Sequence, residues 1–271
     1  VIVFRTTPNL PPVHFILYSL AQARGIKTII FCDTWVKHRV VAMTDFVFGV
    51  TELENITKSN FVVSSLELPK DLQEYYNLQT QNAKQVVPIY VPHILRGYSF
   101  WGRVLAAFQA LRQAWHYGLL RKMWRTLIRH IIFWFRSHLS NELPRAYKCL
   151  SLPPDFSKPF IYFPLHFQPE FSTNPLGGYF RDQLLALELL VASLPIGWEI
   201  YVKEHPTQWP MGGTRHNSYR PKDYYYSMAR FPTVRLISTN TDSLQLIRQA
   251  KAVATISGTA GWEAILRGKP A

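Results

Sequence analysis

The clearest pattern in the chain is the alternation of short apolar runs with helical stretches through its second half. Apolar runs typical of buried strands cover 160–164, 199–203, 233–237 and 252–256. Helical spacing and helix-start residues predict helices over 182–193, 224–230, 242–250 and 260–267. Strands that alternate with helices form a doubly wound parallel sheet, so we expect one over 160–271. The loops after its strands should lie along one edge.

The first half predicts a second α/β unit. Residues 1–5 and 27–32 read as strands, and a helix over 14–24 between them ends at Gly25. Further strands are expected within 40–50 and 60–64. The three prolines of 151–159 predict a linker, which gives domains over 1–150 and 160–271. No glycine-rich phosphate loop occurs in the first half, which counts against a kinase or a simple NAD enzyme.

A strongly basic stretch lies within the first predicted domain. Residues 75–141 contain no Asp or Glu, and we expect a basic helical insertion over about 96–140. Within 120–135 the apolar residues share one side of a helix, while Arg121, Arg125 and Arg129 gather on another. Two roles for this helix remain open. It packs on its own domain with a solvated basic face, or this face binds an acceptor or an anionic membrane surface.

Composition narrows the classes of partner. The formal net charge of +13 favours anionic partners such as nucleotide phosphates, anionic lipids and acidic glycans. Nucleic acid is not expected, because no known binding motif accompanies the charge. Cys32 and Cys149 have no metal-type spacing, so we expect a reduced, cytoplasmic protein without a metal site. No run of about 18 apolar residues predicts a spanning helix.

The last segment, TISGTAGWEAILRGKPA, carries the most specific chemistry. A small-residue turn of Ser257, Gly258 and Thr259 joins a strand to a helix, and such a helix start attracts anions. The two hydroxyls add donors, and Glu263 lies one turn into the helix, where it could accept hydrogen bonds from ribose hydroxyls. An ordinary helix cap with a solvated glutamate fits the same residues.

This segment, YFPLHFQPEFSTNPLGG over 162–178 and YVKEHP over 201–206 together resemble GT-B glycosyltransferases. The resemblance is to the bacterial capsule polysaccharide biosynthesis family, which includes the Kdo transferases of capsule export, and it covers about 160–271. It implies two Rossmann-type domains with parallel sheets that face a cleft. It also implies sugar transfer from a nucleotide donor to a capsular polysaccharide or glycolipid. If the basic helix face binds lipid, the protein is expected at the inner face of the cytoplasmic membrane. A CMP-activated acidic sugar such as Kdo is the favoured donor, and UDP-sugars fit the same class of site.

The predicted sheet edge brings the candidate groups together. Lys203 and His205 would hold the nucleotide phosphate without a metal ion. Glu170 is the best-placed carboxylate for acid, base or nucleophile chemistry, and His166 is the competing base. His205 could instead cap a helix or fill a core, and Glu170 could cap a helix. Asp-x-Asp is absent from the sequence, so metal-dependent nucleotide binding of the GT-A type is not supported.

Two rival functions fit the chain as a whole. One is that of an enzyme similar to the UDP-sugar 2-epimerases, which needs no acceptor or membrane face. The second is that of a non-catalytic component of a polysaccharide export system, which binds glycan or lipid. The chain starts at Val1 without Met and stops just after GKP, and in the resembling family a further strand follows that point. We therefore expect a fragment that lacks both ends.

Overall fold

The structure of the protein is a computed structural model. The description covers residues 1–5, 12–34, 36, 39–45, 68–81, 100–116, 124, 128–129, 131–132, 142–168, 173, 177–209 and 220–271. These fall into two compact units. The first comprises Val1–Asn82 with Phe171–Arg181, and the second comprises Ala83–Glu170 with Asp182–Ala271.

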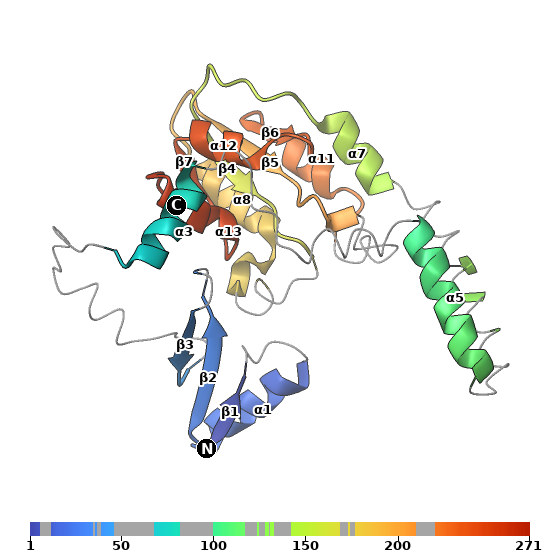
Figure 1. Ribbon diagram of the computed structural model, residues 1–271. Coiled ribbons are helices and arrows are strands. Elements are labelled where there is room, and N and C mark those ends of the chain that lie inside the picture. Colours follow the sequence, from blue (N-terminus) through green and yellow to red (C-terminus); the bar gives the residue numbers. More distant parts are fainter. Residues whose placement is uncertain are drawn as a thin grey trace. The chain divides into compact units, whose positions relative to one another are not determined.

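The second unit is built on a parallel four-stranded sheet (Figure 1). Its strands are β4 (Phe160–Pro164), β5 (Glu199–Lys203), β6 (Val234–Ile237) and β7 (Ala252–Val253). They lie in the order β6-β5-β4-β7, and all three pairings are parallel. The predicted parallel sheet is therefore confirmed, and it is consistent with a Rossmann-like fold.

Helices cover both faces of this sheet (Figure 1). On one face, α7 (Glu142–Leu150), α8 (Gln183–Ala192) and α11 (Tyr224–Ala229) pack on a core that includes Ile200, Val202 and Leu236. On the other face, α12 (Ser243–Gln249) and α13 (Thr259–Leu266) pack on Phe160, Tyr162 and Tyr201. Alternate residues of each strand thus point into two separate apolar cores, as expected for a sheet buried on both sides.

Two aspartates fix where helices of this unit begin. The side chain of Asp182 accepts the backbone N–H of Leu184 at 3.0 Å, and Asp242 accepts that of Leu244 at 3.0 Å. Each satisfies an N–H that has no partner within its helix. Both residues stand at the first position of a predicted helix. Gly268, with φ of 69°, ends α13 in the left-handed conformation that glycine adopts without strain.

Helix α7 was not predicted, although it has a clear apolar face. Leu143 and Tyr147 lie in the core beneath α8 and α11, and Pro144 falls in the first turn, where proline is tolerated. The segment after α7 is also held by the sheet, since Leu152 pairs with Ile237 and the Tyr201 hydroxyl bonds both backbone atoms of Asp155. The predicted domain limits at 150 and 160 stay predictions, but residues 142–159 pack with the second unit.

The first unit contains a smaller sheet. Its strands β1 (Ile2–Phe4), β2 (Thr28–Asp33) and β3 (Val40–Met43) lie in that order, and Phe4, Ile30 and Tyr18 of α1 (Pro12–Ala23) form its core. The pair β1 and β2 is parallel, but β3 runs antiparallel to β2. The expectation of a parallel sheet was wrong for β3. The Thr34 N–H donates to the Arg39 carbonyl at 3.1 Å, and a connection this short reverses the chain, whereas a parallel pair needs a long crossover.

Three further elements complete the described chain. The first unit adds α3 (Lys70–Gln81) and the short 3-10 helix η1 (Gly178–Arg181), and α5 (Phe100–His116) lies within the predicted basic insertion. Residues 124, 128–129 and 131–132 are also helical, while the predicted strand over 60–64 lies outside the described residues. Within the part of the chain that the structure describes, every helix is too short or too polar to cross a membrane.

Candidate functional site

The four parallel strands of the second unit deliver their following loops to one edge of the sheet. Strands β5 and β6 lie on one side of β4, and β7 lies on the other. The strand order therefore reverses between β4 and β7. In open α/β sheets, ligands bind in the crevice at such a reversal, beyond the carboxyl ends of the strands. The loops that follow β4 and β7 are therefore the first place to look for a site.

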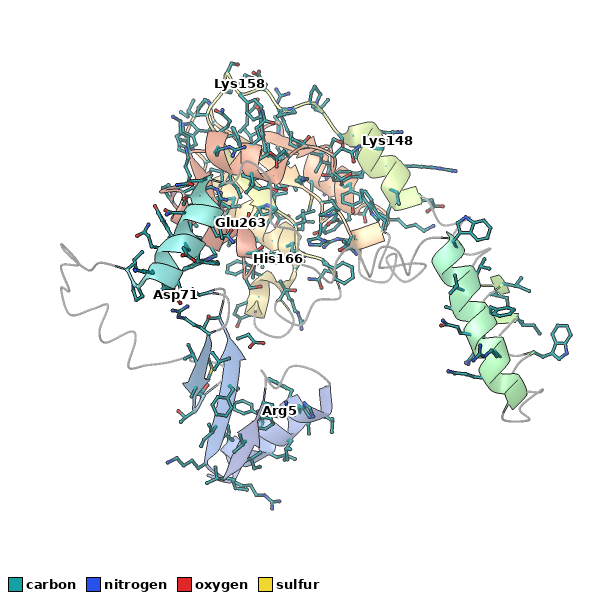
Figure 2. The ribbon with its side chains drawn as sticks, viewed as in Figure 1. Arg5, Asp71, Lys148, Lys158, His166 and Glu263 are labelled. Atoms are coloured by element: carbon teal, nitrogen blue, oxygen red, sulfur yellow. The ribbon has the colours of Figure 1, made fainter. Side chains whose placement is uncertain are left out.

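His166, two residues beyond β4, lies against the loop that follows β7. The side chain is buried, and its Nε2 atom is 3.2 Å from the Ile256 backbone nitrogen and 3.2 Å from Thr255 Oγ1. A backbone N–H can only donate, so Nε2 accepts here and carries no proton. The His166 ring therefore holds the β7 loop in place. Figure 2 labels His166 together with Glu263, a residue of α13.

Gly258 is required by this contact. A Cβ atom at residue 258 would lie 2.9 Å from His166 Cε1 and 2.9 Å from Thr255 Oγ1. The Gly258 N–H also donates to Thr255 Oγ1 at 3.1 Å, which keeps the turn tight. No side chain fits without moving the histidine ring or the threonine. The glycine in the turn is thus explained by the close approach of His166.

The turn leads directly into the start of α13. Gly258 is the N-cap residue, so no side chain caps the first N–H groups of this helix. Beside it, the hydroxyl oxygen of Ser257 is buried without a hydrogen-bond partner among the described residues, and Thr259 is exposed. An open helix start next to an unpaired hydroxyl is an arrangement that can bind an anionic oxygen.

Glu263 lies one turn further along α13 and is partly buried. Burial raises the pKa of its carboxyl, Arg267 partly offsets this rise, and Asp242 adds to it. Its Oε2 atom is buried without a hydrogen-bond partner in the described part of the chain. A carboxylate in this setting gains from any hydroxyl that donates to it. Its predicted contact with a ribose stays a prediction.

Lys203, the last residue of β5, is buried under α12. Its Nζ atom lies 2.6 Å from the carbonyl oxygen of Thr241 and 2.7 Å from Ser243 Oγ. Burial lowers the pKa of Lys203 to about 8, and the nearby Asp242 opposes this change. The ammonium group thus holds the start of α12 in this structure. Its predicted contact with a phosphate stays a prediction.

His205 follows two residues beyond β5 and is partly buried. Its Nδ1 atom lies 2.8 Å from Thr207 Oγ1 and 3.3 Å from the Thr207 N–H. The Phe167 ring, from the β4 loop, packs edge-on against the imidazole with 6.0 Å between ring centroids. Residues on the β4 and β5 loops are therefore in direct contact, as the sheet topology requires.

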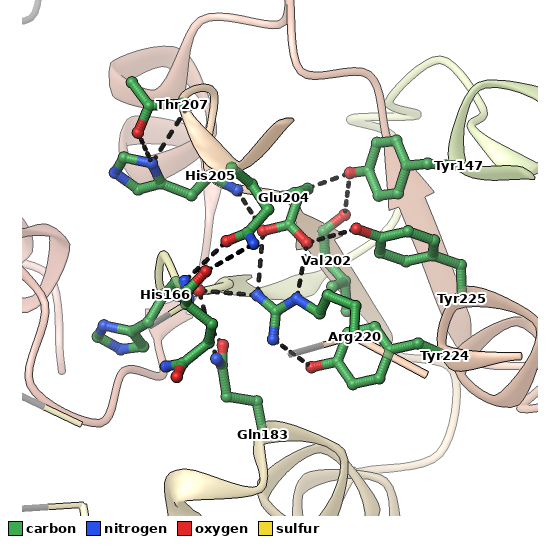
Figure 3. Close-up of polar contacts among 12 residues, drawn as sticks. Tyr147, His166, Gln183, Val202, Glu204, His205, Thr207, Arg220, Tyr224 and Tyr225 are labelled. Atoms are coloured by element: carbon green, nitrogen blue, oxygen red, sulfur yellow. Dashed lines mark hydrogen bonds and ion pairs between the residues drawn. The ribbon is translucent and has the colours of Figure 1, made fainter. Parts of the chain in front are cut away.

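Beneath these loops lies a buried ion pair that the sequence did not predict (Figure 3). Arg220 and Glu204 are 2% and 0% exposed, and the guanidinium donates to both carboxylate oxygens at 3.2 Å. The Tyr225 hydroxyl donates to Glu204 at 2.6 Å, and a second Arg220 contact joins the His166 carbonyl at 2.7 Å. Burial lowers the pKa of Arg220, but the carboxylate outweighs it, so that the net pKa rises. This pair fixes the β4 loop relative to the β5 loop.

Two glutamines hold the same loop from the other side. Gln183 accepts the His166 N–H at 2.7 Å and returns a bond to the His166 carbonyl at 3.3 Å. Gln208 does the same for Gln168, at 2.7 and 2.9 Å. Paired amide bonds of this kind replace a strand partner for a loop that has left the sheet. The two glutamine side chains thus make four hydrogen bonds to the backbone of His166 and Gln168, in addition to the bond from Arg220.

Some predicted site residues lie outside the described residues. These are Glu170, Arg121 and Arg125. Arg129 is described, is helical and has an exposed side chain. Sequence reasoning could have found Glu204 from its place directly after a predicted strand. It had no signal for Arg220, which follows a long polar loop. In the described chain, no group of three or more His, Cys, Asp or Glu side chains could hold a metal ion.

Comparison with known proteins adds one positive result. Residues 174–271 match the model of a family described as capsule polysaccharide biosynthesis protein. The matched segment contains β5, β6, β7 and the turn before α13. No curated protein matches the chain. The family resemblance drawn from the sequence is therefore confirmed for residues 174–271, which match the model of this family.

Proposed function

We propose that the chain is a metal-independent glycosyltransferase of the GT-B type. It would move a sugar from a nucleotide donor to a capsular polysaccharide, a related surface polysaccharide or a glycolipid. The observation that carries the proposal is the contact of His166 with the turn before α13, at the reversal of strand order. The family match supports the same conclusion, because it includes this turn. In GT-B enzymes, two Rossmann-type domains face a cleft that holds donor and acceptor.

The donor nucleotide would bind along the carboxyl edge of the second sheet. Its phosphate would accept hydrogen bonds from the uncapped N–H groups of α13 and from the hydroxyls of Ser257 and Thr259. Lys203 and His205 would add a cationic group and a further donor. Glu263 would accept from the ribose hydroxyls. A CMP-activated acidic sugar such as Kdo is the favoured donor, because the family resemblance points to it, and UDP-sugars fit the same class of site. The formal net charge of +13 favours anionic ligands in general.

The two candidate catalytic residues would divide their roles. His166 Nε2 already accepts the Ile256 N–H, so His166 is better suited to hold the donor turn than to remove a proton. Glu170 lies two residues beyond Gln168, whose backbone is clamped by Gln208. A carboxylate this close in sequence to a fixed segment is a candidate to act on the acceptor hydroxyl or the reacting sugar. We therefore assign the acid, base or nucleophile role to Glu170.

A nucleotide screen tests the proposal directly. Thermal unfolding is measured with CMP, UDP and GDP, and a ligand at 100 times its dissociation constant should stabilise the fold by about 2.7 kcal/mol. Ser257→Ala and Thr259→Val should weaken the binding of the identified nucleotide. Ser193→Ala, at the far end of α8, is the matched control and should bind normally.

The outcomes separate the competing functions. Absence of binding by all three nucleotides would remove the donor site and the proposal with it. Binding without any sugar transfer would favour a non-catalytic component of an export system. Binding of UDP with sugar epimerisation and no acceptor would favour an enzyme of the UDP-sugar 2-epimerase type.

A further inference from the structure

Helix α5, within the predicted basic insertion, presents large apolar side chains to solvent. Trp101 is 72% exposed, Phe108 68%, Leu105 60% and Val104 43%. Successive residues of an α-helix are about 100° apart, so these four positions fall within an arc of about 100°. Isolated exposed apolar residues are ordinary on a protein surface, but four on one arc of one helix form a continuous apolar face.

Four residues on other sides of the helix differ in character. Gly102, Ala106, Gln109 and Gln113 are small or uncharged polar residues, and they fall outside the arc. Arg112 is exposed and lies one turn beyond Phe108, so it falls on the same side of the helix as the apolar arc, at the C-terminal end of the apolar face. An arginine there can lay its aliphatic stem along an apolar surface while its guanidinium reaches a polar layer.

The charge around α5 restricts what this face can contact. Residues 75–141 contain nine Lys and Arg and no Asp or Glu, so this quarter of the chain carries +9 of the formal +13. Four of the eight tryptophans also fall in this stretch, namely Trp101, Trp115, Trp124 and Trp134. The partner must therefore combine negative charge with an apolar layer beneath it, and it must accommodate tryptophan at the boundary.

We infer that α5 lies flat on an anionic phospholipid surface, with Trp101, Val104, Leu105 and Phe108 in the boundary between headgroups and acyl chains. Helices that bind in this way combine an apolar face, basic residues and interfacial tryptophan. The anionic headgroups supply the charge that the stretch lacks, and each basic residue near them strengthens binding. This inference concerns a different part of the chain from the donor site, and it does not depend on sugar transfer.

Vesicle sedimentation of the whole chain, without nucleotide, tests the inference. The parent protein should bind phosphatidylcholine vesicles that contain phosphatidylglycerol, and bind pure phosphatidylcholine much less, at about 0.1 M salt. The double variant Trp101→Ser/Phe108→Ser should lose at least about tenfold in partitioning. Arg112→Gln should lose about fivefold on the anionic vesicles only, as expected for a single basic residue. Ile196→Ser is the control, because Ile196 is fully exposed but lies outside α5, in the connection between α8 and β5.

A second measurement reports insertion itself. Lipids with brominated acyl chains should quench the tryptophan fluorescence of the parent, and the Trp101→Phe variant should bind equally well but show less quenching. Failure of the parent to bind anionic vesicles would overturn the inference. Normal binding by the double variant, or unchanged quenching in Trp101→Phe, would also overturn it and leave only an electrostatic contact. A loss of binding in Ile196→Ser as large as that in the double variant would show that α5 is not the contact.

Discussion

His166 Nε2, beyond β4, accepts a hydrogen bond from the backbone nitrogen of Ile256, beyond β7, at 3.2 Å. The two residues are 90 positions apart in the sequence. Their contact joins the two loops between which the strand order of the sheet reverses. A change at His166 should therefore be felt first in the turn that precedes α13.

The first prediction concerns this contact. Gly258→Ala should weaken nucleotide binding and cost roughly 1–3 kcal/mol of stability, because the new Cβ would lie 2.9 Å from the His166 ring and from Thr255 Oγ1. Calorimetry and denaturant unfolding measure the two effects. In a His166→Ala background the same substitution should cost less, since one of its two close contacts is gone. Equal costs in both backgrounds would show that His166 does not constrain the turn.

The second prediction concerns the buried ion pair. Arg220→Met or Glu204→Gln alone should each lower the free energy of unfolding by about 3–5 kcal/mol, because a single substitution leaves the other buried group uncompensated. The double variant should cost less than the sum of the two. The control is the pair Lys222–Glu142, with side chains 78% and 63% exposed. Lys222→Met should cost less than about 1 kcal/mol. Additive costs at Arg220 and Glu204 would contradict direct coupling.

The third prediction concerns pH. Burial lowers the pKa of Lys203 from its ordinary 10.5 to about 8, against the opposing effect of Asp242. Between these two pH values the unfolded chain binds the proton and the folded chain does not. The free energy of unfolding should therefore rise with pH over this range, by up to about 3 kcal/mol relative to Lys203→Met. Denaturant titrations at several pH values measure the difference, and parallel curves for the two proteins would refute it.

The fourth prediction separates function from stability at Glu263. Burial raises the pKa of its carboxyl, so the charged form is less favourable in the folded protein than in the unfolded chain. Glu263→Gln should therefore be as stable as the parent or more stable at pH 7, with a gap that shrinks as the pH falls through the carboxyl range. Nucleotide affinity should fall nevertheless, because the amide is a poorer acceptor for ribose hydroxyls. Thermal unfolding with and without nucleotide measures both, and unchanged affinity would remove Glu263 from the site.

The fifth prediction divides the chemistry between two loops. His205→Ala should impair donor binding and turnover together, whereas Glu170→Gln should keep donor affinity and lose roughly 100-fold or more in turnover. A change that lowers turnover without weakening ground-state binding identifies a group used in the transition state. Sugar transfer is measured beside nucleotide affinity for each variant. Near-normal turnover in Glu170→Gln would move the acid or base role to His166.

The elements of the second unit were predictable because local signals agreed with the global arrangement. Strands β4 and β5 match their predicted ranges, and α8 begins after Asp182 and ends before Ser193, the limits of the predicted helix. Strand β7 is shorter than predicted, since only Ala252 and Val253 pair with β4 before the chain turns toward His166. The apolar pattern predicts which residues are buried, but it does not show where the chain leaves the sheet to contact another loop.

The interior of the candidate site was less accessible to sequence reasoning. The partner of Glu204 is Arg220, and no periodicity links a residue at a strand end to one after a polar loop. Lys203 at a strand end was predicted to face a ligand, but its Nζ is bonded to Thr241 and Ser243. The spacing of residues identifies the edge of the sheet, whereas the direction of a long side chain depends on which buried acceptors lie within reach.

Helix α7 lies before the proline-rich segment in sequence, yet it completes the core of the second unit. Tyr147 receives the Glu204 N–H at 2.8 Å and donates to the Ile237 carbonyl at 2.6 Å, so it ties together the ends of β5 and β6. A fusion of a different N-terminal half at Ser151 would remove Tyr147, and with it the hydrogen bonds that join the ends of β5 and β6 beneath the site. A fusion before Glu142 would keep the helix. The core beneath the candidate site thus includes α7, which lies upstream of the segment predicted to be the linker.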